Sequence, residues 1–197
     1  MLPMTLSLTL FSFLSGVGVS TTGYYTPFMI LGIAIAASGA FLISTTWVVS
    51  SPASQWVGFQ VILGAGVGLG LQQAHTAAQT VLSPADVPTG AVVLIFSHVI
   101  GGAISIPIAQ NVFTSRLIGG LEKAIPGVES NVTSVLTMGV TGLRKAFTDP
   151  DVFGKVLVVY NHAVRGAFLC GAVLAAIAIV ASLGMEWRSI KKAKLEM

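Results

Sequence analysis

Residues 156–185 read VLVVYNHAVRGAFLCGAVLAAIAIVASLGM and hold one charged side chain, that of Arg165. A spanning helix needs about 20 predominantly apolar residues to cross the roughly 30 Å hydrocarbon core of a bilayer. This run therefore predicts a transmembrane helix. Trp187 lies just beyond it, and Trp is favoured at membrane interfaces.

Four more apolar runs precede this one. They cover about residues 2–19, 27–49, 55–82 and 89–113, and short turns rich in Ser, Pro or Gly separate them. The sequence therefore predicts an all-α integral membrane protein, with about five transmembrane helices in a single bundle over residues 1–197. In this prediction residues 114–155 form an outer segment, and residues 186–197 form a tail.

The composition favours a bilayer over water as the solvent of this chain. Hydrophobic residues make up 54% of the sequence, charged residues 9%, and the mean hydropathy is +0.87, whereas roughly a quarter of an average soluble domain is charged. Four of the ten basic residues lie in the tail: Arg188, Lys191, Lys192 and Lys194. By the positive-inside rule we expect a cytoplasmic C-terminus. The rule does not distinguish one membrane from another; our expectation is the plasma membrane, with the vacuolar membrane as the alternative. The basic residues form no aromatic-studded patch, so we expect no nucleic-acid partner.

The outer segment predicts two amphipathic helices. Phe113, Leu117, Leu121 and Ile125 recur every fourth residue, and apolar residues between Val132 and Phe147 follow helical spacing. We expect both helices to lie on the membrane surface or to cover the bundle. Asn131 opens an Asn-Val-Thr triplet, which makes it a candidate glycosylation site.

The functional signal lies in the polar residues within the spans. In the third span one helical stripe contains Gln60, Gly64, Gly68, Gln72, Thr76 and Gln79, with Gln73 and His75 beside it. Polar side chains in a spanning helix are costly unless they face the bundle interior or water, so we expect the stripe to face inward. Gly64, Gly66, Gly68 and Gly70 form two overlapping GxxxG patterns. These patterns predict close helix packing, with bending of the helix as the alternative interpretation.

The fourth and fifth spans carry fewer polar residues. The fourth contains Ser97, His98, Gly101, Gly102, Ser105 and Gln110. In the fifth we expect Arg165 to extend to the membrane interface, with a place on a substrate path as the alternative.

The sequence predicts no catalytic residue, cofactor or metal site. His75, His98 and His162 lie on different spans, and the spans hold no partner carboxylate. We therefore expect the chain not to be an enzyme. His75 is the best candidate for a protonatable group, although we expect it to be a packed, hydrogen-bonded side chain. Cys170 is expected to be a small packing residue.

An ordered series of motifs gives the chain a family resemblance. The series comprises LPM (2–4), SGVGVSTTGYYTPFM (15–29), WVGFQ (56–60), GAGVGLGLQQ (64–73), AQTVL (78–82) before DVP (86–88), GGA (101–103) before AQNVF (109–113), Tyr160-Asn161, and GMEWR (184–188). It resembles the C-terminal portion of the fungal fourteen-helix drug:proton antiporters of the major facilitator superfamily. The chain departs from that family at Thr21, where a basic residue is frequent, and at His75, where an apolar residue is common.

The resemblance implies a proton-coupled efflux transporter that exports small apolar compounds such as toxins, secondary metabolites or drugs. It implies further that Gln72, Gln73, Gln79 and Gln110 line a substrate cavity, which His75 adjoins. Gly16 and Gly23 would belong to a conformationally important loop, and Gly64, Gly68, Gly101 and Gly102 are candidate conformational glycines in the spans.

The length of the chain limits what the resemblance implies for activity. Such transporters have an N-terminal half and one more helix that these 197 residues lack. We therefore expect a fragment that transports nothing by itself, with the missing half as a partner besides lipid, substrate and protons. Two other functions stay open: a small membrane scaffold or assembly protein, and an oligomeric pore.

Overall fold

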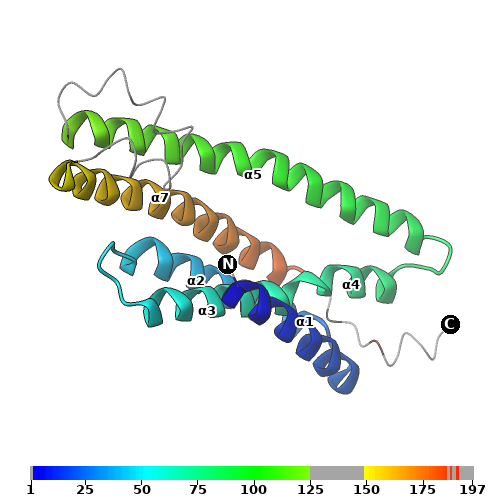
Figure 1. Ribbon diagram of the computed structural model, residues 1–197. Coiled ribbons are helices and arrows are strands. Elements are labelled where there is room, and N and C mark those ends of the chain that lie inside the picture. Colours follow the sequence, from blue (N-terminus) through cyan, green and yellow to red (C-terminus); the bar gives the residue numbers. More distant parts are fainter. Residues whose placement is uncertain (1, 125–148, 186, 188–189, 191–197) are drawn as a thin grey trace.

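A computed structural model describes residues 2–124, 149–185, 187 and 190, and all regular elements of these residues are α-helices (Figure 1). The helices are α1 (Leu2–Thr22), α2 (Thr26–Thr46), α3 (Ala53–Leu71), α4 (Gln73–Val81), α5 (Val87–Ala124) and α7 (Pro150–Leu183). With α3 and α4 taken together, 5 helical stretches are long and apolar enough to cross a membrane. The predicted all-α class and the five spans are therefore confirmed by length and composition.

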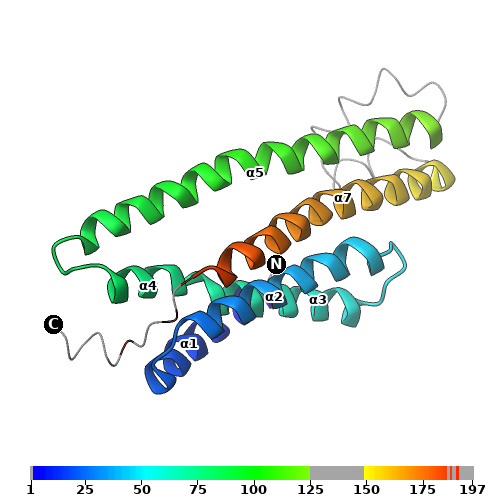
Figure 2. The same ribbon diagram turned by 180° about the vertical axis from the view of Figure 1, so that it is seen from behind.

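The order of the helices in space differs from their order in the chain. α3 packs between α1 and α2, α2 packs on its other side against α7, and α7 packs against α5 (Figures 1 and 2). α4 continues the line of α3 toward the first turns of α5. The bundle is therefore an open row, in which α5 has α7 and α4 as its substantial neighbours among the described helices.

α1 and α3 run parallel in a fixed register. The hydroxyl of Ser7 donates to the carbonyl of Val61 over 2.7 Å, and the hydroxyl of Ser15 donates to the carbonyl of Leu69 over 2.9 Å. Both bonds join residues 54 positions apart in the chain. Two small hydroxyl side chains thus fix the axial position of α1 on α3.

The packing of α3 against α2 depends on Gly66. A Cβ atom there would lie 2.6 Å from the Cα of Ala36 and 2.7 Å from the carbonyl oxygen of Gly32, both in α2. No side chain fits into such a contact, because its neighbours are backbone atoms of another helix. The close approach that the GxxxG spacing predicts is therefore present between α2 and α3.

α5 and α7 are longer than the sequence prediction. They have 38 and 34 residues, or about 57 and 51 Å at 1.5 Å per residue, and they extend beyond the α2–α3 turn (Figure 1). At this end Leu117 and Leu121 are buried against Val156 and Ala163. α7 begins six positions early because the carboxylate of Asp149 accepts from the backbone N–H of Asp151 at 3.0 Å, an N-cap that the prediction missed.

This contact corrects the prediction for the first part of the outer segment. Residues 114–124 are not a separate surface helix but the last turns of α5, and their every-fourth-residue apolar pattern packs on α7. Phe113 contributes an edge-on contact with Tyr160, with ring centroids 5.3 Å apart. Asn131 and the second predicted amphipathic helix lie outside the described residues.

Arg165 binds the end of a neighbouring helix, which neither sequence interpretation anticipated. Its Nε donates to the carbonyl of Ser44 at 2.7 Å, and its Nη2 donates to the carbonyl of Thr45, both in the last turn of α2. The last carbonyls of a helix lack partners within the helix and carry partial negative charge. Arg165 therefore joins α7 to the C-terminal end of α2.

The turn between α1 and α2 is held by Gly23 and by the tail. Gly23 has φ of 81°, a conformation that side chains with a Cβ rarely adopt. Its carbonyl accepts from the backbone N–H of Ile190 at 2.9 Å. Ile190 also packs against a cluster formed by Val19, Tyr25 and Ala77. Ile190 of the tail thus contacts the α1–α2 turn.

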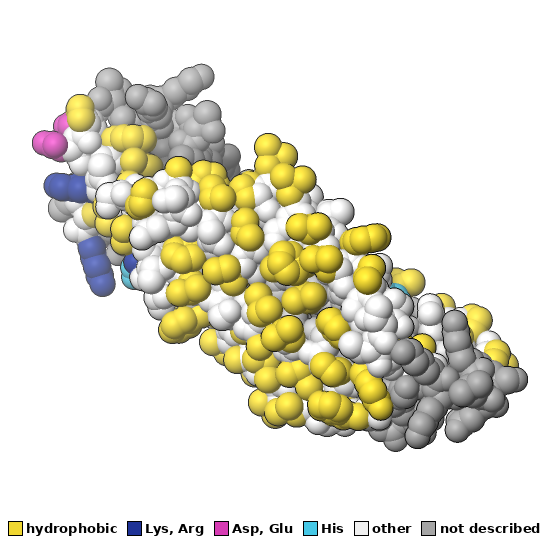
Figure 3. All heavy atoms as spheres, turned by 90° about the horizontal axis from the view of Figure 1, so that it is seen from below, with side chains coloured by type: hydrophobic (Ala, Val, Ile, Leu, Met, Phe, Trp, Pro, Cys, Tyr) yellow, Lys and Arg dark blue, Asp and Glu magenta, His cyan; other side chains and the backbone are white. Residues whose placement is uncertain are grey.

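The surface of the bundle exposes many large hydrophobic side chains. Hydrophobic side chains are spread along the face in Figure 3, and the charged side chains that it shows lie at one end. On α5, Phe96 is 64% exposed and Ile106 is 69% exposed. Apolar side chains this exposed, over this many turns, fit lipid or further helices rather than water.

Candidate functional site

The third span is interrupted at Gln72, between α3 and α4. Gln72 has φ of −84° and ψ of −13° and ends α3, after which α4 begins at Gln73. The interruption follows the glycine-rich stretch that made bending an open interpretation. It separates the close-packed α3 from the shorter and more polar α4.

A polar groove runs along α1 beside this interruption. It has a volume of about 780 Å³. α1 contributes Leu8, Thr9, Ser12, Phe13, Gly16, Val17 and Ser20, while the break and α4 contribute Gln72, His75, Thr76 and Gln79. Its size lies within the range of pockets that hold drug-sized molecules.

The groove offers mainly its amide and imidazole groups, because three of its four hydroxyl side chains already donate to nearby backbone carbonyls. The hydroxyls of Thr9, Ser20 and Thr76 donate to backbone carbonyls of their own helices or of the adjoining break. Gln72, His75 and Gln79 are exposed and line the groove. The two glutamines are seven residues apart, or roughly 10 Å along the helix. Each amide can both donate and accept, so the wall can bind uncharged polar groups at two separated points.

The structure brings three of the five predicted substrate-path residues together, namely Gln72, His75 and Gln79. Gln73 is elsewhere, since it is 1% exposed and buried between α1 and α4. Gln110 is exposed on α5 and is not one of the groove residues. His75 is exposed in the groove, so the described residues do not supply the packed surroundings that were expected for it.

The α1 wall of the groove was missed by the sequence reasoning. Thr9, Ser12, Gly16 and Ser20 recur at spacings of three or four, so small or hydroxyl side chains form one stripe of α1. This periodicity was available in the sequence. It was overlooked because Ser and Thr are common in spanning helices and satisfy their own hydrogen bonds there.

The candidate conformational glycines have three different surroundings. Gly16 lies within α1, not in a loop as the resemblance implied, and it lines the groove with open space where a Cβ would be. Gly64 and Gly68 lie against the backbone of α1 at Met4 and Leu8. A Cβ added at Gly101 or Gly102, on α5, would have no neighbour within 4 Å among the described residues.

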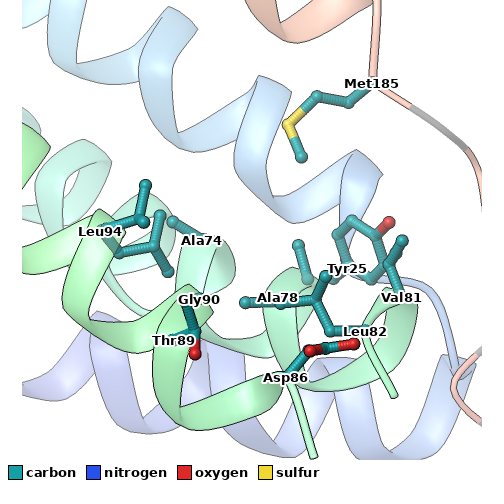
Figure 4. A pocket seen from close by; sticks show the side chains of 12 residues that line it. Tyr25, Ala74, Ala78, Val81, Leu82, Asp86, Thr89, Gly90, Leu94 and Met185 are labelled. Atoms are coloured by element: carbon teal, nitrogen blue, oxygen red, sulfur yellow. The ribbon is translucent and has the colours of Figure 1, made fainter.

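A second, apolar pocket of about 790 Å³ lies between α4 and the start of α5 (Figure 4). Tyr25 and Met185 close one side, and Val81, Leu82 and Leu94 are among the apolar side chains around it. Asp86 supplies a carboxylate, which accepts from the hydroxyl of Ser83 at 2.7 Å. The pocket offers few polar groups and suits an apolar occupant.

No group of three or more His, Cys, Asp or Glu side chains within the described ranges is placed to hold a metal ion. The described residues that line the groove likewise include no Asp, Glu, Lys or Arg. The arrangement therefore suits binding of an uncharged molecule.

Curated proteins similar to this chain are transporters. It is 43% identical over 194 residues to the MFS-type transporter astH of Aspergillus oryzae, a match covering 98% of this chain and 34% of the relative. The chain is a homologue of fungal MFS-type transporters. A second relative, the MFS-type efflux pump MFS1 of Trichophyton rubrum, is 40% identical over 99% of this chain and 36% of the pump. The MFS thioclapurine efflux transporter tcpA of Claviceps purpurea is 40% identical over 98% of this chain and 35% of that protein.

This homologue spans about a third of the length of the curated MFS-type relatives that it matches. No family model and no solved structure matches the chain. The resemblance to the major facilitator superfamily is confirmed by the named relatives, and their names describe transport rather than catalysis. The five apolar helical stretches and these relatives together indicate an integral membrane protein.

Proposed function

We propose that the chain forms part of the transport path of an efflux transporter for small, mostly apolar compounds. The observation that carries the proposal is the polar groove between α1 and α4, which has Gln72, His75 and Gln79 on one open face of an otherwise apolar bundle. Polar side chains within spanning helices commonly mark a substrate path in membrane proteins. The efflux activity in the names of the relatives supports the same proposal.

The lining of the groove indicates the class of compound. Leu8, Phe13 and Val17 supply apolar area, and the amides of Gln72 and Gln79 supply hydrogen bonds without net charge. A permanently charged ligand would meet no opposite charge from these lining residues, whereas a neutral compound with a few polar groups would be matched at both ends. We therefore propose neutral amphipathic compounds, toxins and secondary metabolites among them.

The remaining surfaces fit the rest of a longer transporter. Along much of its length, α5 exposes both apolar and polar side chains. The apolar pocket between α4 and α5 has room for side chains of another helix. We propose that further helices, including those of an N-terminal half, pack there and complete the path. Under this proposal transport is coupled to protons, the protein lies in the plasma membrane and its C-terminal tail is cytoplasmic.

A chimera with a full-length relative tests the proposal. We would replace the aligned third of the Claviceps purpurea transporter, which is 40% identical, with these 197 residues, and measure thioclapurine export from cells. The chimera is expected to export the compound at a rate within roughly tenfold of the parent transporter, because the groove supplies the same kind of wall.

The same experiment includes the 197-residue chain by itself in liposomes under a pH gradient. It is expected to transport nothing, since the groove lies on an open face and the described helices supply no opposite wall. A chimera that reaches the membrane in normal amount and exports nothing would contradict the proposal. Single-channel conductance by the chain alone would favour a pore, and stable co-purification with an unrelated membrane protein would favour a scaffold.

A further inference from the structure

A buried hydrogen-bond junction lies directly behind the polar groove, at the interruption of the third span. The carbonyl of Leu69, one turn before Gln73, accepts two side-chain donors: the hydroxyl of Ser15 at 2.9 Å and the Nε2 of Gln73 at 3.2 Å. The Nε2 of Gln73 also donates to the hydroxyl oxygen of Ser15 at 2.5 Å. Three residues from α1, α3 and α4 thus share one closed set of bonds.

This junction is almost free of solvent. Ser15 is 0% exposed and Gln73 is 1% exposed. In an uninterrupted helix a carbonyl accepts from the backbone N–H four residues later, which for Leu69 is that of Gln73. Here α3 ends at Leu71 and α4 begins at Gln73, and the amide side chain of Gln73 and the hydroxyl of Ser15 bind the carbonyl. The junction therefore satisfies a backbone group at the interruption, where an unpaired one would be costly.

We propose that Ser15 and Gln73 are positioning residues that hold α4 against α1 and thereby set the width of the groove. Neither side chain lines the groove. Gln72 and His75 lie on either side of Gln73 in the chain, so any rotation of α4 about the interruption moves His75 relative to α1 and Gln72. The proposal rests on the groove being the ligand-facing surface described above.

One polar atom of the junction has no hydrogen-bond partner among the described residues. This atom is the Oε1 of Gln73, which is buried. A buried unpaired acceptor destabilises the closed arrangement relative to one in which it reaches water or a donor.

Ser7 supplies a matched control on the same pair of helices. Its hydroxyl donates to the carbonyl of Val61 at 2.7 Å, in the same register as the bond from Ser15 to Leu69, and Ser7 is 6% exposed. Val61 lies well inside α3, away from the interruption. Loss of either hydroxyl removes one bond between α1 and α3, but only loss of Ser15 affects the junction.

The test measures the width of the groove by pulsed electron paramagnetic resonance. Spin labels are attached at Phe13→Cys on α1 and Gln79→Cys on α4, in a Cys170→Ser background of the full chain in lipid nanodiscs. Ser15→Ala and Gln73→Met are expected to broaden the distance distribution roughly twofold and to speed hydrogen exchange of α4 amides about tenfold. Ser7→Ala is expected to leave the distribution narrow, and Ser15→Thr, which keeps a hydroxyl, is expected to restore it.

Two results would overturn the proposal: an unchanged distribution in both Ser15→Ala and Gln73→Met, or equal broadening in Ser7→Ala, which would mean general loosening of α1. Failure of the proposed function would appear in the export assay and not in the distance measurement. In that case the thioclapurine chimera exports nothing, while the junction variants still broaden the distribution. The two outcomes are read from separate measurements, so each proposal can fail without the other.

Discussion

Gly66→Ala is expected to disrupt the packing of α2 on α3 and to lower the stability of the folded protein strongly. The added Cβ would lie 2.6 Å from the Cα of Ala36 and 2.7 Å from the carbonyl oxygen of Gly32. Overpacking of a core typically costs about 1–3 kcal/mol, and here the obstructing atoms are backbone atoms that cannot change rotamer. We expect a loss at or above the upper end of that range, against a total stability of about 5–15 kcal/mol for a typical domain.

Gly58→Ala is the control, because it makes the same change in the same helix. No described residue lies within 4 Å of a Cβ at Gly58, and alanine favours a helix over glycine by up to about 1 kcal/mol. Thermal unfolding and the monodisperse yield in detergent are the measurements. Gly58→Ala should match or exceed the parent chain, while Gly66→Ala should unfold at a much lower temperature. Equal stability of the two variants would mean that α2 and α3 do not approach as the structure describes.

Replacing both groove glutamines, Gln72→Leu with Gln79→Leu, is expected to reduce thioclapurine export by the chimera at least about tenfold. The polar groups of a bound compound would then face apolar side chains without hydrogen bonds. One such loss costs about 1–3 kcal/mol, and 1.4 kcal/mol corresponds to a factor of ten. Each single variant should produce a smaller loss, with Gln79→Leu the cleaner of the two because Gln72 also ends α3.

Thr9→Val provides the comparison for the glutamine variants. Thr9 lines the same groove, but its hydroxyl donates to the carbonyl of Thr5 at 3.0 Å, within its own helix. Loss of this hydroxyl therefore removes no hydrogen-bond donor that is free for a ligand. Export should stay within about twofold of the unmodified chimera. Comparable losses from Thr9→Val and the double variant, at equal amounts of protein in the membrane, would count against recognition by the amides.

Much of the fold could be predicted from the sequence because hydrophobic run length alone specifies a spanning helix. The C-terminal end of α5 could not, since it depends on tertiary contacts. Leu117 and Leu121 continue α5 only because Val156 and Ala163 of α7 are there to pack against. The start of α7 was detectable in principle, since Asp149 precedes Pro150 in a typical cap and first-turn sequence.

Only part of the candidate site could be predicted from the sequence. Helical spacing placed Gln72 and Gln79 on one stripe, and the structure places both in the groove. Gln73 differs from Gln72 by one position, a rotation of about 100° around the helix, and that rotation makes it a buried bridge to Ser15. Its partner could not be predicted, because the register of α1 on α3 is a tertiary property. The same holds for Arg165, whose partners are backbone carbonyls of α2.

If the groove between α1 and α4 is part of the transport path proposed above, it is open to water, while the rest of the bundle faces lipid or packs against other helices. Ser12 and Leu10 test it most directly, since both lie near the middle of α1 but only Ser12 lines the groove. Each is changed to cysteine in the chimera, with Cys170→Ser, and exposed to a membrane-impermeant maleimide in intact membranes. The account predicts labelling of Ser12→Cys and none of Leu10→Cys until detergent is added. Equal labelling of the two, or labelling of Leu10→Cys alone, would contradict it.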